Sequence, residues 1–176
     1  SLINVYQVFK EDRYLDLAEK YYKQIETNFM KDEIFHCYSK GTVFLEDYAF
    51  LIKCLLDLYE VTLNIEYKIK AQKLSDQCIK KFFLKSKNIF QKNPIDTNDL
   101  FISPIDISDH TIPNGNSIML SNLSRLRNLE IGKKLSNSLN GYLNLFKSHM
   151  LSSVRSIDMF KEISSGKKCT EDGCQI

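Results

Sequence analysis

The most constraining feature of the sequence is an internal repeat with a period of 53 residues. Residues 5–29 align with residues 58–82, with identical residues at seven positions. A period near 50 residues, made of a helix, a short turn and a second helix, indicates stacked helical hairpins. Such hairpins can form an open solenoid or close into an α/α toroid. Long irregular loops favour the toroid, in which loops cover a central cavity rimmed by helix ends. The identical pairs are Tyr6/Tyr59, Val8/Val61, Tyr14/Tyr67, Ala18/Ala71, Lys20/Lys73, Gln24/Gln77 and Phe29/Phe82.

Apolar residues recur with helical spacing along nearly the whole chain, which predicts an all-α fold. The segment 45–61 is apolar almost all round, so we expect it to be buried between neighbours. Asp12 is a candidate N-cap for the helix that follows it. Helices are expected at residues 2–9, 13–29, 45–61, 65–84, 116–129, 131–146 and 148–163, with a short extended piece at 34–39 and a long irregular connection at 85–114.

Length and charge set the class of protein. The chain has 176 residues and a net charge of +2, which suits one domain and gives no case for a nucleic-acid surface. No segment reaches the roughly 18 unbroken apolar residues of a membrane span. The chain starts at Ser1, inside an expected helix, so we interpret residues 1–163 as part of a toroid from a longer protein. We expect residues 164–176 to form a loosely ordered tail.

Five cysteines are present. Cys37, Cys54 and Cys78 lie in apolar patterns and are expected to be small core residues. Cys169 and Cys174 lie in the polar tail, with no His nearby to complete a zinc site. An odd count argues against a full disulfide framework and favours a reducing, cytoplasmic location. No metal or other cofactor is predicted.

The first candidate site is the start of the 45–61 helix. Glu46 and Asp47 occupy its first turn, where carboxylates are stabilised by the helix dipole. At the mouth of a toroid cavity, a partly desolvated carboxylate there could act as a general acid or base. Two neighbours on a helix point about 100° apart, so we expect one of them to face the cavity and favour Asp47. Tyr48 is a candidate ligand-binding residue beside them.

The second candidate site is the polar loop at residues 109–117, which leads into a helix. Pro113, Gly115 and a capping Ser117 or Asn116 are explained by a turn and a helix start. Asp109 and His110 are not, and such a pair beside a helix N-terminus could bind a polyhydroxylated or anionic ligand. We predict that Asp109 is catalytic. The predicted ligand-binding residues of this loop are His110, Asn114, Asn116 and Ser117.

These two segments resemble the YyaL-like, or spermatogenesis-associated protein 20, family. Members carry a helix start of leucine, an acid, Asp, Tyr and Ala, and later an Asp followed by Pro-Ser-Gly-Asn-Ser. Here Asn114 replaces the serine of that motif. The resemblance covers residues 2–146. It implies part of an (α/α)6 toroid of the six-hairpin glycosidase type, which follows a thioredoxin-like domain in full-length members.

Two functions are compatible with these residues. The first is a carbohydrate-active enzyme, a hydrolase or epimerase, with Asp47, Asp109 and Glu46 as acid–base candidates. A glycosidase needs two carboxyl groups about 5–10 Å apart. The second is a non-catalytic helical domain that binds a ligand or partner and serves a thioredoxin-like domain. In that case Asp47 and Asp109 should be satisfied by capping and backbone bonds. The expected partners are a carbohydrate or another polar small molecule, and the remaining hairpins and thioredoxin-like domain of its own polypeptide.

Overall fold

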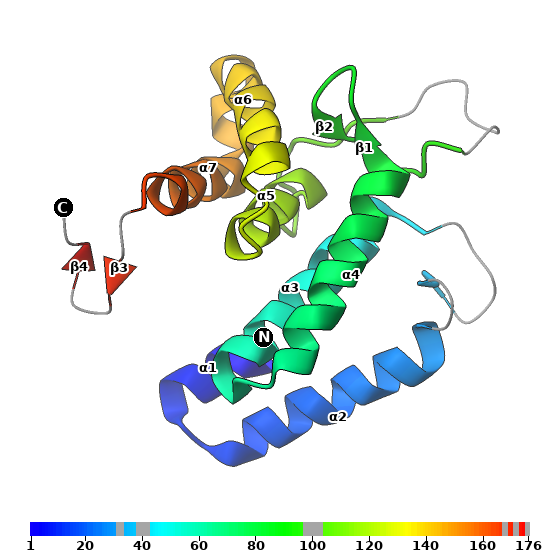
Figure 1. Ribbon diagram of the computed structural model, residues 1–176, viewed down its shortest axis with the longest axis vertical. Coiled ribbons are helices and arrows are strands. Elements are labelled where there is room, and N and C mark those ends of the chain that lie inside the picture. Colours follow the sequence, from blue (N-terminus) through cyan, green and yellow to red (C-terminus); the bar gives the residue numbers. More distant parts are fainter. Residues whose placement is uncertain (31–33, 38–42, 97–103, 167–168, 171–172, 175–176) are drawn as a thin grey trace.

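The chain is a stack of α-helical hairpins, which confirms the predicted all-α class. The computed structural model describes residues 1–30, 34–37, 43–96, 104–166, 169–170 and 173–174. The first two hairpins lie one above the other, and three further helices lie above them (Figure 1). The α-helices are α1 (Leu2–Phe9), α2 (Asp12–Phe29), α3 (Leu45–Thr62), α4 (Ile65–Phe82), α5 (Gly115–Arg125), α6 (Leu129–Phe146) and α7 (Leu151–Ser164), with a 3-10 turn at Lys147–His149.

The sequence repeat is reproduced at the residue level. A shift of 53 places the ends of α2 on the ends of α4, and the last residue of α1 on the last residue of α3. Lys10 and Leu63, the equivalent residues of the two turns, both have φ of 56°. The N–H of each closes its helix on the carbonyl of a tyrosine, Tyr6 or Tyr59, at 2.8 Å. The predicted repeat is therefore a repeat of complete hairpins.

The third hairpin, α5 and α6, has a similar connection that is one residue longer. Arg127 between α5 and α6 has φ of 60°, and Asn128 precedes the first residue of α6 as Asn64 precedes the first residue of α4. Each of the three turns thus contains one left-handed residue followed by one residue before the next helix, and the turn between α5 and α6 contains Leu126 in addition. The side chain of the left-handed residue Leu63 is exposed.

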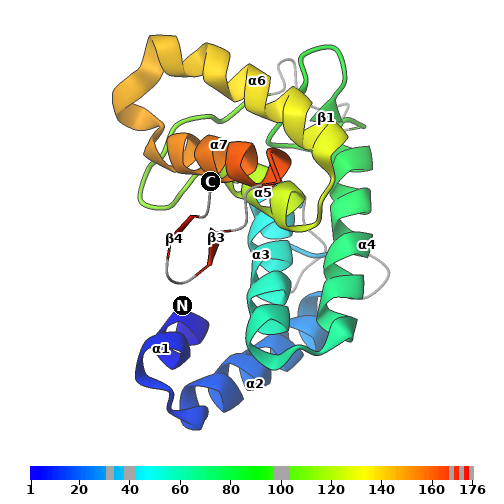
Figure 2. The ribbon, with the colours of Figure 1, turned by 60° about the vertical axis from the view of Figure 1, so that its left-hand side comes forward.

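The helices alternate between two rows. Helix α3 packs on α5 and α5 packs on α7, while α4 and α6 each pack beside their hairpin partners. Figure 2 shows α5 and α7 above the start of α3, with α4 alongside. Helix α3 is buried from several sides, as its apolar composition predicts. Its buried residues are Leu45, Tyr48, Ala49, Leu51, Ile52, Leu55, Leu56 and Leu58.

Several local expectations need correction. The segment after α4 contains a small antiparallel pair, β1 (Phe83–Leu84) and β2 (Ile89–Phe90), that apolar periodicity did not predict. The prediction that Asp12 is an N-cap is wrong: Asp12 is the first residue of α2, and the N-cap of α2 is Glu11. Cys37 is exposed, whereas Cys78 is buried as expected. The extended piece at 34–39 and the tail lie partly outside the described residues; within the tail, β3 (Cys169–Thr170) pairs with β4 (Gly173–Cys174).

Candidate functional site

Three helices of one row begin at the same place, which we call the rim. The rim is formed by the first residues of α3, α5 and α7, namely Leu45, Gly115 and Leu151. A Cβ added to Gly115 would lie 2.9 Å from the Leu45 side chain, so α3 and α5 start in contact. Because helix N-termini carry unpaired N–H groups and partial positive charge, the rim favours carboxylates and other oxygen ligands.

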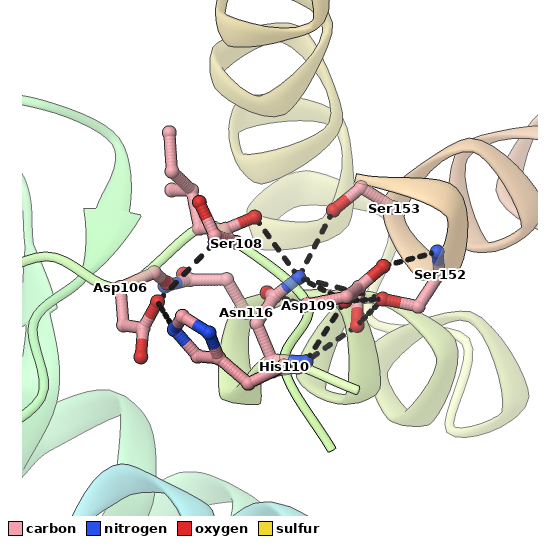
Figure 3. A network of polar contacts seen from close by, with 10 residues as sticks. Asp106, Ser108, Asp109, His110, Asn116, Ser152 and Ser153 are labelled. Atoms are coloured by element: carbon pink, nitrogen blue, oxygen red, sulfur yellow. Dashed lines mark hydrogen bonds and ion pairs between the residues drawn. The ribbon is translucent and has the colours of Figure 1, made fainter. Parts of the chain in front are cut away.

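Asp109 joins the starts of α5 and α7. One carboxylate oxygen accepts hydrogen bonds from the backbone N–H and the side-chain amide of Asn114, at 3.1 and 2.9 Å, and from the hydroxyl of Ser152. The other accepts from the backbone N–H of Ser152 at 2.8 Å. Figure 3 shows Asp109 directed at Ser152, the second residue of α7. Asp109 therefore caps one helix and orders the turn before another.

These bonds decide the charge of Asp109. Burial alone would raise the pKa of its carboxyl, but the hydrogen bonds donated by Ser152 and Asn114 outweigh burial and lower the pKa below its ordinary value. Asp109 thus remains ionised at neutral pH, with both oxygens engaged. A general acid must hold a proton near the working pH, and the geometry of Asp109 opposes that role.

The residues that follow Asp109 are also engaged in the scaffold. Asn114 is the N-cap of α5: its side-chain oxygen accepts from the N–H of Ser117 at 2.9 Å. The Ser117 hydroxyl donates to the Asn114 carbonyl at 2.8 Å. Asn116 is fully buried and bonds both backbone groups of Phe90 and the carbonyl of Asp106, at 2.9–3.0 Å. Asn116 therefore holds the loop that carries Asp106 against α5.

A cavity of about 400 Å³ opens at the rim, between the start of α3 and this loop. We call it the rim pocket. Asn114 lines this pocket, whereas Asp109 does not. The ionisable residues that line the rim pocket are His36, Glu46, Asp47, Lys92, Asp106 and His110.

Glu46 is the most unusual group in the rim pocket. It is the second residue of α3, and its carboxylate oxygen Oε2 is buried without a hydrogen-bond partner among the described residues. Burial raises the pKa of Glu46, and the negative charges of Asp106 and Asp47 raise it further. A hydrogen bond from its own backbone N–H and the charge of Lys92 oppose this rise without cancelling it. A half-buried carboxyl with a raised pKa and a free oxygen is the kind of group that can hold and deliver a proton.

Asp47, favoured over Glu46 by the sequence argument, lines the same pocket but is already bonded. One of its oxygens accepts from the backbone N–H of Phe44 at 2.8 Å, which caps the start of α3. The other lies 2.9 Å from Nδ1 of His36. Both neighbours in the helix therefore reach the cavity, and Glu46 is the one whose oxygen is unengaged. Asp47 is thus the acidic partner of His36, which comes from the segment between α2 and α3.

The remaining charged groups, those of Lys92, Asp106 and His110, come from the connection between β2 and α5. The exposed ring of His110 has its Nε2 atom 3.9 Å from a carboxylate oxygen of Asp106 (Figure 3). The backbone of Lys92 joins the start of α3 to Pro104: its carbonyl accepts from the N–H of Leu45 at 2.9 Å, and its N–H donates to the Pro104 carbonyl at 2.8 Å. Sequence reasoning missed Lys92 and Asp106. The alternation of Ile105 and Ile107 around Asp106 is the signal that could have indicated the aspartate.

Tyr48 lies away from the cavity. Its side chain is fully buried, and its ring packs at 5.5 Å, edge-on, against Phe82.

The described residues contain no group of three or more His, Cys, Asp or Glu side chains that could hold a metal ion. No helix in the described part of the chain combines the length and apolar character needed to cross a membrane.

The fold thus defines a helical-hairpin protein with an acidic pocket at the ends of its helices, and comparisons with known proteins add one relative. The chain is similar to the uncharacterized protein B0495.5 of Caenorhabditis elegans, with 33% identity over 139 residues. The matched region is 72% of this chain and 19% of that protein, so the chain spans about a fifth of its relative's length. No family model matches the chain.

Proposed function

We propose that the rim pocket is a carbohydrate-active site with carboxylate acid–base chemistry, of the hydrolase or epimerase type. The observation that carries this proposal is Glu46, a half-buried carboxyl with a raised pKa and an unpaired oxygen in the pocket. Asp106 supplies a second carboxylate in the same cavity. Acid–base hydrolysis of a glycosidic bond uses a pair of carboxyl groups, and Glu46 and Asp106 provide such a pair in one cavity.

The proposal includes the setting of the pocket. The alternating rows of helices agree with part of an (α/α)6 toroid, in which α3, α5 and α7 would be inner helices. The motifs that resemble the YyaL-like family support the same assignment, including a thioredoxin-like domain elsewhere in the polypeptide. The relative is much longer than this chain, and the length leaves room for such a domain there. Fold likeness to glycosidases is an analogy and supplies a starting expectation only.

The test compares Glu46→Gln with Glu66→Gln. Both glutamates are the second residue of an 18-residue helix, but Glu66 is exposed on α4 and lies outside the pocket. Wild type and both variants are incubated with a panel of glycosides and reducing sugars, and product is followed by NMR. We expect turnover by wild type and Glu66→Gln, with a loss of about 100-fold or more in Glu46→Gln. Equal turnover by Glu46→Gln would contradict the proposal.

A second candidate function is non-catalytic binding of a polar ligand. The engagement of Asp47 and Asp109 in capping favours it, because a purely structural role explains both residues. The same assay distinguishes the two functions. A binding domain shifts ligand resonances in wild type and in Glu46→Gln without any product, whereas the enzyme forms product that depends on the Glu46 carboxyl.

A further inference from the structure

A second cavity, largely apolar, adjoins the rim pocket. It has a volume of about 510 Å³ and lies between the end of α2, residues 34–36 and the first half of α3. We call it the apolar pocket. Its side chains are mainly hydrocarbon, aromatic or thiol groups, among them Ile25, Phe29, Ile34, Phe50, Leu51 and Cys54.

The two cavities share part of their walls. His36, Glu46, Asp47 and Ile112 line both. The shared carboxyl of Glu46 therefore lies at the junction, with charged groups on one side and apolar groups on the other. A ligand that fills both cavities would place its polar part beside Asp106 and Lys92, its apolar part beside Phe50, and the bond between the two parts near Glu46.

Among the described residues that line the apolar pocket, the Cys54 thiol is the only polar side chain besides the shared His36, Glu46 and Asp47. Burial raises the pKa of the Cys54 thiol to about 11, so this thiol is neutral at ordinary pH. A hydrocarbon or aryl group can enter such a cavity without leaving its own polar atoms unpaired, whereas a second sugar ring would leave several hydroxyls without partners. The chemistry of the wall thus discriminates between kinds of ligand.

We infer that the molecule bound is a glycoside with an apolar aglycone, the sugar in the rim pocket and the aryl or alkyl group in the apolar pocket. This inference rests on the proposed function and deepens it. It also favours hydrolysis over epimerisation, because epimerisation of a free sugar makes no use of an aglycone cavity. The junction position of Glu46 is what an acid acting on the connecting oxygen requires.

The reaction then balances with water as the second reactant. The Glu46 carboxyl donates its proton to the glycosidic oxygen as the bond from that oxygen to the anomeric carbon breaks. The bonding electrons leave with the aglycone as an alcohol or phenol. Water adds to the anomeric carbon and gives its extra proton to the Asp106 carboxylate. The products are a free sugar and an apolar alcohol, and no oxidant or metal is consumed.

The test uses matched pairs of phenyl and methyl β-glycosides of glucose, galactose, mannose and N-acetylglucosamine, with phenol alone as a further probe. Binding is measured by protein-observed NMR titration. For at least one sugar we expect the phenyl glycoside to bind roughly tenfold or more tightly than its methyl partner, as burial of one aromatic ring predicts. Phenol alone should bind more weakly than that phenyl glycoside.

Variants locate the preference. Ile25→Lys places a charge at the wall of the apolar pocket at a side chain that is 39% exposed, so the fold tolerates it. Ile69→Lys, on α4 and 62% exposed, is the matched control. We call the ratio of the methyl-glycoside Kd to the phenyl-glycoside Kd the phenyl preference. It should fall to near one in Ile25→Lys and stay at the wild-type value in Ile69→Lys. A phenyl preference of one in wild type, or one that Ile25→Lys leaves intact, overturns this inference and leaves the proposed function standing. Failure of every glycoside to bind overturns this inference too, and the turnover assay with Glu46→Gln and Glu66→Gln then decides the proposed function.

Discussion

Two carboxylates at the rim, those of Asp109 and Glu46, have opposite environments. Both lie at the rim, each next to the first turn of a helix. Asp109 receives donors at both oxygens and its pKa is lowered, whereas Glu46 has a buried oxygen without a partner and a raised pKa. A carboxylate that is fully bonded stabilises the fold, and one that is left unpaired costs stability. The difference separates the scaffold of the rim from its reactive part.

The largest expected effect is at Asp109. Asp109→Asn removes the charge that two backbone N–H groups and a hydroxyl contact, and should lower the free energy of unfolding by about 2–3 kcal/mol. Urea denaturation at pH 7 measures it. The control is Asp158→Asn, an exposed position on α7, which should change stability by less than about 0.5 kcal/mol. Similar small losses in both variants would mean that Asp109 is not a structural cap.

Gly115 tests how tightly the two carboxylate regions are joined. In Gly115→Ala the new Cβ would lie 2.9 Å from Leu45 and 3.4 Å from a Glu46 oxygen. We expect a loss of about 1–2 kcal/mol from overpacking, partly offset by the helix propensity of alanine. Gly141→Ala, on α6, meets no atom within 4 Å and should gain up to about 1 kcal/mol. Thermal unfolding should show shifts of opposite sign, and a gain in both would refute the close contact at the rim.

Replacing Asp47 should destabilise the fold, as replacing Asp109 does, but by a smaller amount. Asp47→Ala removes the acceptor for the Phe44 N–H at the start of α3. The expected loss is about 1 kcal/mol, the usual value of a helix cap. Asp76→Ala, at an exposed position on α4, is the control and should be within about 0.5 kcal/mol of wild type. If Asp47→Ala is equally neutral, the cap contributes nothing and Asp47 is free for chemistry.

The smallest effect, and the only stabilising one among the three carboxylates, is expected at Glu46. A carboxyl whose folded pKa is raised binds more protons in the folded state, so stability falls as the pH rises from the ordinary value of 4.5 through the folded pKa. Glu46→Gln should therefore be more stable than wild type at pH 7, and the difference should vanish below pH 4.5. Thermal melts from pH 4 to 8 measure it, with Glu66→Gln as the control. A destabilised Glu46→Gln at pH 7 would show that the carboxylate is paired.

The sequence predicts the hairpins well because their information is local. Equivalent tyrosines, Tyr6 and Tyr59, end equivalent helices, and the 53-residue shift places both turns correctly. The β1–β2 pair was missed because two-residue strands contain too few residues for a period to be visible. Its Phe90 is held by Asn116, a contact across 26 residues that no local pattern contains.

The site is less accessible from sequence. The first turn of α3 identified Glu46 and Asp47 as a pair, but their separate roles depend on a backbone N–H at Phe44 and on His36, which approaches from another segment. Lys92 and Asp106 enter the pocket through loop contacts with α3 and α5. The sequence alone shows which charged residues lie in the first turn of a helix. Their burial depends on segments that pack over the helix end and are distant in the sequence.

The hairpin connection has a consequence for how such a protein can change over time. Lys10, Leu63 and Arg127 adopt the same left-handed conformation with different side chains, so the turn places little demand on residue type. A unit closed in this way can be copied whole in a gene, and each copy can then diverge along its helices without losing its reversal of direction. The loops between hairpins, which carry Asp106 and His110, are the parts left free to acquire new chemistry.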